Sequence, residues 1–575
     1  MTPPNRTRAC PDFEEPGPDS AVRRQAALHR DTAPYTGLYT GPQTDVQLAG
    51  LGHLQTIAGE QTTAAALGVR PKIQLPAYVT GQQPVLPREP RGLRALAARL
   101  PWQLSVVLIV QAGLSLRLIW SNTAFQDEAL YIWAGRVEWS HWLRGTPVPD
   151  FPAYFSGAPV VYPPLAALAA VDGLAGARLL SLCFMLAATC CLYGVGCTLY
   201  GRVAGIGGAA LFAVFGMGQV LGAFATYDAM ALFLLAAASL LTVRASGPLS
   251  EPLLMAAAIL IALADAAKYA AALWDPVIFT LAGLAATRGD TGRRIFRGLR
   301  LTGYVAALVA LSLHAGGHQY VHGIFYTTVS RQLAADSSPQ AVLLMSWGWL
   351  GGLVAVAAVG VFLSWSDGTR RFALAAVLLA AVALAPLEQA RISTSTSLHK
   401  HVVFGAWFAC VVGGYAIQRM ARLDARPAWA AAMIALAAAI VVIPGQSQAT
   451  FMYQTWPSYA KTMPVMTAAV SAQGCPCLMS AASVSQYYLE LGATEVASPQ
   501  QAALDGLHGT PAAVEGIARG YYAVVEVDAN DLLEPADYAV IQAALTHSVY
   551  YRRVSSVPWS GHPATPSEVW ERVPA

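Results

Sequence analysis

The sequence predicts a mainly α-helical protein that crosses a membrane many times and carries a small α/β domain at its C-terminal end. The membrane part follows from a mean hydropathy of +0.45 and a charged-residue content of only 12%. Soluble domains carry about 25% charged residues, so a soluble protein of this composition is excluded. The α/β part follows from residues 446–575, where strand-like and helix-like runs alternate.

Residues 1–100 differ from the rest of the chain in composition. They are polar, rich in Pro, Gln, Thr and Gly, and end in the basic stretch REPRGLRALAARLPW. This composition predicts a disordered cytoplasmic tail with a basic segment next to the membrane. The beginning has no apolar core of the kind found in cleaved signal peptides. The formal net charge of only +3 gives no indication of a nucleic-acid partner.

The transmembrane catalytic domain is expected at residues 101–445. A segment that crosses a hydrocarbon core of ~30 Å needs about 20 apolar residues. About eleven segments satisfy this requirement: 102–120, 174–199, 203–222, 226–244, 252–268, 270–287, 301–317, 341–364, 372–390, 401–418 and 428–445.

The distribution of Arg residues predicts how these segments are oriented. Arg gathers in alternate connections, for example at Arg293, Arg294, Arg370 and Arg371. Connections rich in Lys and Arg stay on the cytoplasmic side, which places the N-terminus inside. An odd number of spans then places residues 446–575 outside the cell membrane, together with the long first loop at 121–163.

The first outer loop contains a helix-like stretch that begins near SNTAFQDEALYIWAGRVEW. Leu130, Trp133 and Val137 share one face of this helix, and Trp favours the membrane interface. We therefore expect an amphipathic helix that lies on the outer leaflet.

Asp127 and Glu128 stand at the beginning of that helix and have two interpretations. Asp is a preferred N-cap and Glu is favoured in a first turn, so both residues could serve the helix alone. A carboxylate where a lipid head group meets a water-borne acceptor could instead act as a general base. Asp228 adds a carboxylate at the outer end of another span, again either as a cap or as a site residue. A divalent cation held by Asp127, Glu128 and Asp228 is an alternative that the spacing leaves open.

Cationic residues also gather near the outer ends of the predicted spans. Lys268 lies three residues after Asp265 on one helix face, so it could pair with that carboxylate or neutralise a phosphate. Arg178 lies in an apolar helix, where an unpaired charge is costly.

A second cationic cluster, His399-Lys400-His401, stands at the outer start of the tenth span. These side chains could be interfacial anchors or ligands of a phosphate. Cys475 and Cys477, in GCPCLMS, could form a disulfide, contribute to a weak metal site or have no role. The sequence contains no P-loop, HExxH or GxSxG motif.

The stretch DEALYIWAGR resembles the Asp-Glu motif of the polyprenyl-phosphate-dependent GT-C glycosyltransferases. This superfamily includes the protein O-mannosyltransferases and the aminoarabinose transferases that act on lipid A. YPPLAALAAVDGLAGARLLSL, YGRVAGIGGAALFAVFG and YDAMALFLLAAASL are similar to the second, third and fourth spans of these enzymes. The resemblance covers roughly residues 100–420.

The resemblance implies that Asp127 is the catalytic base and Asp228 a second acidic site residue. It also implies that Lys268 and the cationic start of the tenth span face the lipid phosphate. Many relatives carry an Arg-Tyr pair where this chain has His399-Lys400-His401, which is a departure from the pattern.

These observations predict a glycosyltransferase with a polyprenyl (dolichyl-type) monophosphate sugar as donor. The sugar would move to an acceptor hydroxyl on a glycan, a lipid or a protein at the outer face of the cell membrane, with membrane lipids around the protein. Glu128 is expected beside Asp127 in the catalytic site, and Arg178, Lys268, His399, Lys400 and His401 around the donor phosphate. A transporter or flippase for a lipid-linked sugar is the alternative, although such folds show internal repeats that this sequence lacks.

Overall fold

The computed structural model describes residues 101–153, 155–245, 250–285, 291–329, 337–422, 427–454, 456–528, 535–558 and 566–573. The predicted tail at residues 1–100 lies outside the described residues.

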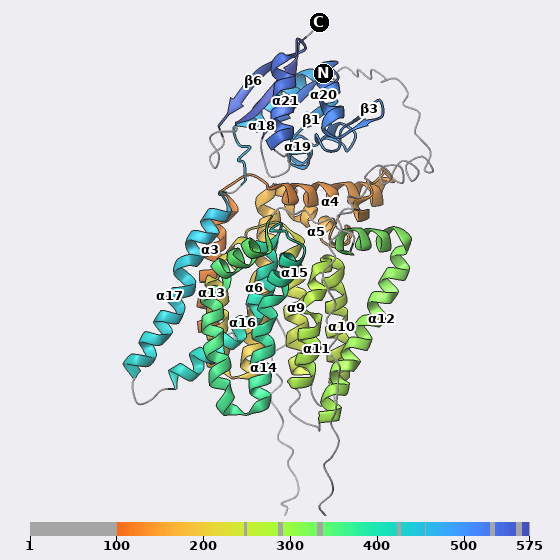
Figure 1. The fold of residues 1–575 in the computed structure, drawn as a ribbon. Helices are drawn as coiled ribbons and strands as arrows, with labels where there is room; N and C mark the ends of the chain where they lie inside the picture. Colours follow the sequence, from red (N-terminus) through yellow and green to blue (C-terminus); the bar gives the residue numbers. More distant parts are fainter. Residues whose placement is uncertain are drawn as a thin grey trace, which may run out of the picture. The chain divides into compact units, whose positions relative to one another are not determined.

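Helices dominate the membrane part of the chain (Figure 1). Among the described residues, nine helical segments are long and apolar enough to cross a membrane. They comprise α3 (Trp102–Ile119), α6 (Leu174–Leu199), α9 (Tyr227–Arg244), α10 (Ser250–Ala267), α12 (Thr291–Ile324), α13 (Pro339–Ser364), α14 (Thr369–Ala380) continued by α15 (Leu384–Arg391), α16 (Leu398–Ala421) and α17 (Pro427–Met452). The chain is a multi-pass membrane protein, and the predicted helical bundle is confirmed.

The remaining two predicted segments, 203–222 and 270–287, form interrupted helices. The first divides at Phe215, whose extended backbone (φ −66°, ψ 123°) separates α7 (Arg202–Val214) from α8 (Gly216–Leu221). The second divides into the 3₁₀-helix η4 (Tyr269–Trp274) and α11 (Asp275–Leu284). Pro276 stands in the first turn of α11, where its missing N–H costs no helical hydrogen bond.

Helix α16 is the centre of the bundle, and 89% of its most apolar stretch is buried. It packs closely on α7 because both helices carry glycine at the contact. A Cβ atom on Gly414 would lie 2.1 Å from the carbonyl oxygen of Ala204 and 2.5 Å from the amide nitrogen of Gly208. Only hydrogen fits at Gly414, so this contact fixes the distance between the two helices.

The expected helix of the first outer loop is present as α4 (Gln126–Arg144), which packs on α5 (Pro163–Ala169). Its buried face differs in part from the prediction, because Leu130 and Val137 are only half-buried. Trp133 is buried, and its Nε1–H donates to the carbonyl oxygen of Leu491, in the C-terminal part of the chain. Helix α4 is therefore covered by protein on a face that was expected to meet lipid.

The C-terminal part is the expected small α/β unit (Figure 1). Its sheet has the order β2-β1-β5-β7-β6, in which β1 runs parallel to β2 and β5, and β7 runs antiparallel to β5 and β6. The sheet strands are β1 (Cys477–Met479), β2 (Val496–Ala497), β5 (Val524–Val527), β6 (Tyr551–Val557) and β7 (Ser567–Arg572). A separate hairpin is formed by β3 (Ala503–Leu504) and β4 (Leu507–His508). The helices of this part are α18 (Thr462–Gln473), α19 (Ala482–Leu489), α20 (Thr510–Ala518) and α21 (Pro535–His547).

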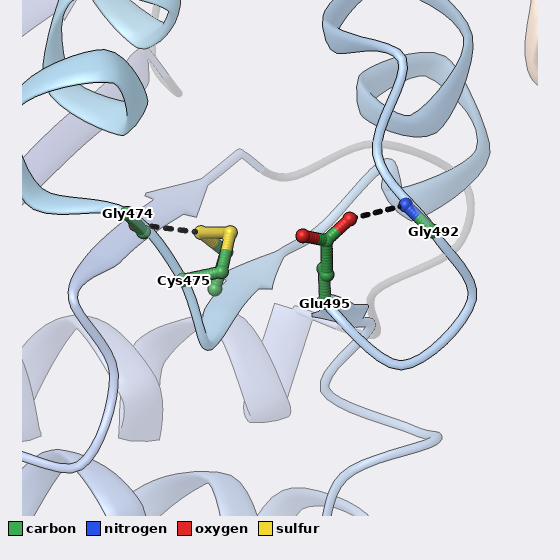
Figure 2. The surroundings of a disulfide bond; sticks show 5 residues. Gly474, Cys475, Gly492 and Glu495 are labelled. Atoms are coloured by element: carbon green, nitrogen blue, oxygen red, sulfur yellow. Dashed lines mark hydrogen bonds between the residues drawn. A yellow bond between two sulfur atoms is a disulfide. The ribbon is translucent and has the colours of Figure 1, made fainter. Parts of the chain in front are cut away.

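Of the alternatives for the two C-terminal cysteines, the structure has the disulfide. Cys475 and Cys477 are bonded to each other where β1 begins, Cys477 being the first residue of that strand (Figure 2). The Cys477 sulfur lies 3.5 Å from the carbonyl oxygen of Gly474. In the loop beside it, the amide of Gly492 donates to a carboxylate oxygen of Glu495 over 2.6 Å.

The close contact between α7 and α16 yields a prediction for Gly414→Ala. The added methyl group meets backbone on the neighbouring helix, so the two helices must separate. Overpacking of this kind costs about 1–3 kcal/mol. We expect a lower thermal unfolding temperature for the purified variant in detergent. Gly303→Ala in α12 is the control, because its Cβ would meet nothing within 4 Å, and equal stability of the two variants would contradict the packing argument.

Candidate active site

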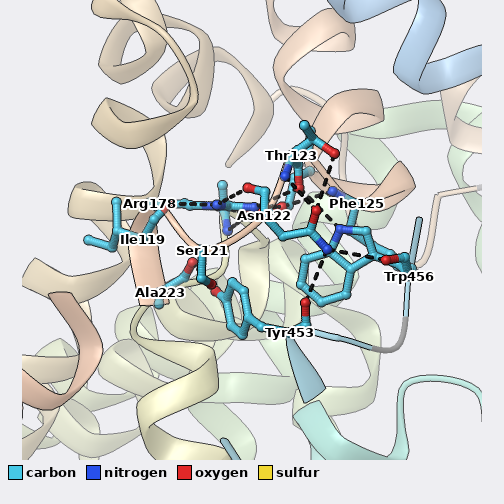
Figure 3. Close-up of polar contacts among 12 residues, drawn as sticks. Ile119, Ser121, Asn122, Thr123, Phe125, Arg178, Ala223, Tyr453 and Trp456 are labelled. Carbon is cyan, nitrogen blue, oxygen red and sulfur yellow. Dashed lines mark hydrogen bonds and ion pairs between the residues drawn. The ribbon is translucent and has the colours of Figure 1, made fainter. Parts of the chain in front are cut away.

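The site is built around the turn between α3 and α4, which directly precedes Asp127 and Glu128 in the first turn of α4. Arg178 of α6 lies under this turn with its side chain fully buried. Its Nη1 donates to the carbonyl oxygens of Ile119 and Asn122, and its Nη2 donates to that of Thr123 (Figure 3). A single guanidinium therefore holds three consecutive parts of the turn.

Glu128 completes this arrangement. Its two carboxylate oxygens accept from Arg178 Nε over 2.8 Å and from Arg178 Nη2 over 2.6 Å. They also accept from the backbone amides of Phe125 (3.0 Å) and Ala225 (2.8 Å). Neither the Glu128 nor the Arg178 side chain is exposed to solvent, each at 0%.

These contacts change the expected roles of both residues. A guanidinium has five N–H donors, and all five donors of Arg178 are engaged by Glu128 and the turn. No donor remains for a lipid phosphate. Glu128 likewise directs its carboxylate away from solvent. The expected phosphate contact of Arg178 and the expected catalytic position of Glu128 do not agree with this geometry, which gives both residues a positioning role.

The segment after α17 holds the same turn from another side (Figure 3). The side-chain amide of Asn122 donates to the carbonyl oxygens of Tyr453 and Trp456, over 3.0 and 3.2 Å. The indole N–H of Trp456 donates to the carbonyl oxygen of Thr123 over 3.1 Å. Sequence reasoning missed these residues, because more than 300 positions separate them from the turn and no local pattern marks them.

Asp127 is positioned for chemistry. It is the second residue of α4, and its side chain is 25% exposed. Its Oδ2 lies 2.6 Å from Nζ of Lys400, which is only 3% exposed. A carboxylate that is open on one side and paired with a buried ammonium on the other can meet both an acceptor and an anionic donor.

Asp228 forms a second buried ion pair. Its partner is Lys268, which therefore does not pair with Asp265. Asp228 Oδ1 lies 2.7 Å from Lys268 Nζ, and both side chains are at most 3% exposed. Of the two interpretations of Lys268, the ion pair with Asp265 is therefore not the one that the structure has. The carboxyl group of Asp265 instead lies beside that of Asp275. Lys268 leaves the helix of Asp265 because α10 ends at Ala267, so the three-residue spacing no longer places them on one face.

The two ion pairs form one electrostatic network. Lys400 interacts with the carboxylate of Asp228 as well as with Asp127, and Lys268 interacts with Asp127 as well as with Asp228. His399 and His401 lie in the same field, next to both lysines. The structure thus brings Asp127, Asp228, Lys268 and the His399-Lys400-His401 cluster together from four separate elements.

A shared divalent cation does not fit these residues. Asp127 faces Lys400, Asp228 faces Lys268 and Glu128 faces Arg178, so the three carboxylates point to three different cations. Within the part of the chain that the structure describes, no group of three or more His, Cys, Asp or Glu side chains is placed to hold a metal ion.

Aromatic side chains line the site beside α4. Tyr131 and Tyr227 have ring centroids 4.5 Å apart, and Lys268 Nζ lies 4.7 Å from the centre of the Tyr227 ring. Burial and the nearby Asp127 carboxylate raise the pKa of Tyr131 well above its usual value. Tyr131 therefore stays protonated at neutral pH and acts as a hydrogen-bond donor rather than a base.

An apolar groove runs between α13 and the α14–α15 span. It has a volume of about 350 Å³. Its lining comprises Leu343, Ser346, Trp347, Leu350, Val354, Leu379, Val382, Ala383 and Pro386.

Comparison with known proteins gives matches by structure only. No protein-family model matches the chain, and no curated protein matches its sequence. ArnT from Cupriavidus metallidurans matches with a TM-score of 0.55 and 12% identity, both in its apo state and bound to undecaprenyl phosphate; each alignment covers 83% of this chain and 98% of ArnT. The chain has the fold of ArnT.

A second match is the archaeal oligosaccharyltransferase AglB from Archaeoglobus fulgidus in complex with an inhibitory peptide and a dolichol-phosphate. The TM-score is 0.50 at 13% identity, over 81% of this chain and 74% of AglB. The GT-C type of fold expected from the Asp-Glu motif is confirmed by these matches. At such low identity, the function rests on the site itself.

The closed pair of Glu128 and Arg178 predicts a stability effect for Glu128→Ala. Removing one partner leaves a buried, uncompensated guanidinium, which costs about 3–5 kcal/mol. We expect a large fall in thermal stability or loss of folded protein. The control is Glu388→Ala, which removes the partner of Arg391 from an exposed ion pair worth about 0–1 kcal/mol. Normal stability of Glu128→Ala together with lost turnover would restore the catalytic role first expected for Glu128.

Proposed function

We propose that the protein is a membrane glycosyltransferase that moves a sugar from a polyprenyl monophosphate donor to an acceptor hydroxyl at the extracytoplasmic face. The observation that carries this proposal is the paired arrangement of Asp127 with Lys400 and of Asp228 with Lys268. It supplies one accessible base and two buried cations within one electrostatic network. ArnT and AglB, which share the fold, were solved with undecaprenyl phosphate and a dolichol-phosphate, respectively.

In the proposed reaction, Asp127 takes the proton of the acceptor hydroxyl while that oxygen attacks the anomeric carbon of the sugar. The bond between this carbon and the phosphate oxygen breaks, and its electron pair leaves with the polyprenyl phosphate. The phosphate gains negative charge in this step, and Lys400 and Lys268 stabilise it. Fixed charges in a site that excludes water are often the largest contribution to such a rate acceleration. A single displacement inverts the anomeric centre.

The ion pair of Asp127 also relates donor binding to the position of the proposed base. In this proposal, the donor phosphate takes the place of the Asp127 carboxylate beside Lys400. The Asp127 carboxylate is then free to accept a hydrogen bond from the acceptor hydroxyl.

The remaining residues have supporting roles in this proposal. Glu128 and Arg178 position the turn that carries Asp127. The groove between α13 and α15 is apolar enough for part of the lipid chain of the donor. His399 and His401 lie beside the two lysines and contact the donor head group. A shared metal ion is not included, because the carboxylates do not converge.

Replacing the proposed base gives the most direct test. Asn keeps the shape of Asp127 and caps a helix about equally well, so Asp127→Asn should fold normally. General base catalysis contributes 10²–10⁴-fold, and we expect turnover to fall by at least ~100-fold at unchanged thermal stability. The assay follows transfer of labelled sugar from a synthetic polyprenyl phosphate donor by purified protein.

Asp172→Asn is the matched control, since Asp172 is an exposed carboxylate in η2 (Ala170–Asp172), outside the ion-pair network. Equal turnover of the wild type and Asp127→Asn at saturating donor would remove Asp127 as the base. Movement of the intact lipid-linked sugar across vesicles without transfer would instead identify a transporter or flippase.

The proposal also includes the cell membrane as location and an orientation with the C-terminal unit outside. The Arg distribution supports this orientation, and so does the disulfide of Cys475 and Cys477, because disulfides persist in oxidising compartments. A reporter fused after Ala575 should therefore be active only outside the cytoplasm, and one inserted at Gly289 only inside. Both reporters on one side would show that the span count is wrong by one.

A further inference from the structure

A buried glutamine that sequence reasoning did not single out controls one of the site histidines. Gln389 lies in α15 and is only 4% exposed. Its side-chain Nε2 lies 2.7 Å from the carbonyl oxygen of Thr396 and 3.1 Å from Nδ1 of His401. Both partners belong to the connection into α16 and to its first turn.

These two contacts determine where the proton of His401 lies. A carbonyl oxygen only accepts, so the group that faces Thr396 must be the NH₂ of the Gln389 amide. The second N–H of the same group points to Nδ1 of His401, which must then accept. A neutral imidazole has one donor and one acceptor nitrogen, so the proton of His401 lies on Nε2.

The Nε2–H of His401 is buried and has no hydrogen-bond partner among the described residues. The charged groups around this ring are Lys268, Asp228, Lys400 and, when protonated, His399. Oδ2 of Asp228 is also buried and, in the described part of the chain, has no partner, while Oδ1 faces Lys268. One donor and one acceptor are therefore left unmatched in the same buried field, each at a cost of about 1–3 kcal/mol.

The chemistry of these two atoms selects a ligand. A hydroxyl group can accept from the His401 N–H and donate to the Asp228 carboxylate at the same time. An ionised phosphate oxygen only accepts, so it would face Asp228 Oδ2 with like charge. An ammonium only donates and cannot match the His401 N–H.

We propose that His401 Nε2 and Asp228 Oδ2 bind one hydroxyl of the sugar carried by the donor lipid. Gln389 is the positioning residue that fixes the required tautomer of His401. This inference rests on the proposed glycosyl transfer, and it adds a sugar-recognition site to the phosphate contacts. The acceptor hydroxyl that reacts is assigned to Asp127 instead, because Asp127 is accessible, whereas His401 Nε2 and Asp228 Oδ2 are buried.

The first experiment separates the sugar from the phosphate. Purified full-length protein in nanodiscs is titrated with undecaprenyl phosphate and with undecaprenyl phosphate that carries a pentose or a hexose. Loss of one well-placed hydrogen bond corresponds to about tenfold in affinity. We expect Gln389→Leu to bind the sugar-bearing lipids about tenfold more weakly and to bind undecaprenyl phosphate as the wild type does.

The matched control is Gln418→Leu, which removes another buried amide of the bundle. Gln418 lies near the other end of α16, where its Nε2 donates to the carbonyl oxygen of Tyr200 over 2.7 Å. This variant should bind all of the lipids like the wild type. Equal losses of both lipid classes in Gln389→Leu would show that Gln389 only supports the connection into α16, and would overturn the inference.

A second variant, Gln389→Glu, tests the tautomer directly. A carboxylate only accepts, so it favours a proton on Nδ1 of His401 and raises the pKa of that ring. Below this raised pKa the ring is doubly protonated and keeps its Nε2–H; above it the ring keeps only the Nδ1 proton. The KM for the sugar donor should therefore rise with pH in Gln389→Glu but not in the wild type. Parallel profiles would overturn the proposed tautomer.

A third readout does not depend on transfer. In protein labelled with ¹⁵N-histidine, the signal that is lost in His401→Asn should belong to a ring with its proton on Nε2. A proton on Nδ1 would overturn the inference. If the wild type binds the sugar donor but transfers it to no acceptor, the proposed reaction is wrong. The ratio of the affinities for the sugar-bearing lipid and for undecaprenyl phosphate then still tests the hydroxyl site. If Gln389→Leu raised the KM for the acceptor and not for the sugar donor, the hydroxyl bound by His401 and Asp228 would belong to the acceptor. That result would overturn the assignment to the donor sugar.

Discussion

The buried ion pair between Glu128 and Arg178 is the interaction on which the site depends. An arginine under the outer end of a membrane bundle is very costly unless each of its N–H groups is matched. Here the cost is met by one carboxylate and three backbone carbonyls, and these groups are the backbone of the turn before Asp127. The requirement to satisfy Arg178 therefore fixes the position of the neighbouring carboxylate of Asp127, the proposed base. In this proposal, adjacent acidic residues have different tasks, one structural and one chemical.

The charges of the site are balanced in pairs, and that balance is useful for a protein that binds an anion. Two ammonium groups buried without counter-ions would be strongly destabilising. Asp127 and Asp228 neutralise Lys400 and Lys268. In the proposed reaction, the donor phosphate takes the place of these carboxylates beside the lysines, so the two cations are present without a net buried charge before the donor binds.

The C-terminal unit is part of the site's support. Tyr488 of α19 accepts a hydrogen bond from the amide of Ala124, and Trp456 and Tyr453 hold Asn122 and Thr123. The turn that carries Asp127 is thus held between the bundle on one side and the C-terminal chain on the other. A movement of the C-terminal unit would reach Asp127 through these contacts.

The sequence by itself determined the membrane class, most of the helix positions, the α/β character of the C-terminal part and the charged residues that meet in the site. Hydropathy and strand alternation are local properties, so they can be read along the chain. Strand β7 could not be predicted because SEVWER is polar, and its place in the sheet depends on pairing with both β5 and β6. The ionic partners could likewise not be predicted from the sequence. Lys268 pairs with Asp228 and not with Asp265, and Arg178 pairs with Glu128 and not with a ligand. Such choices depend on which helices pack together, and only the tertiary structure brings charges from distant elements within a few ångströms.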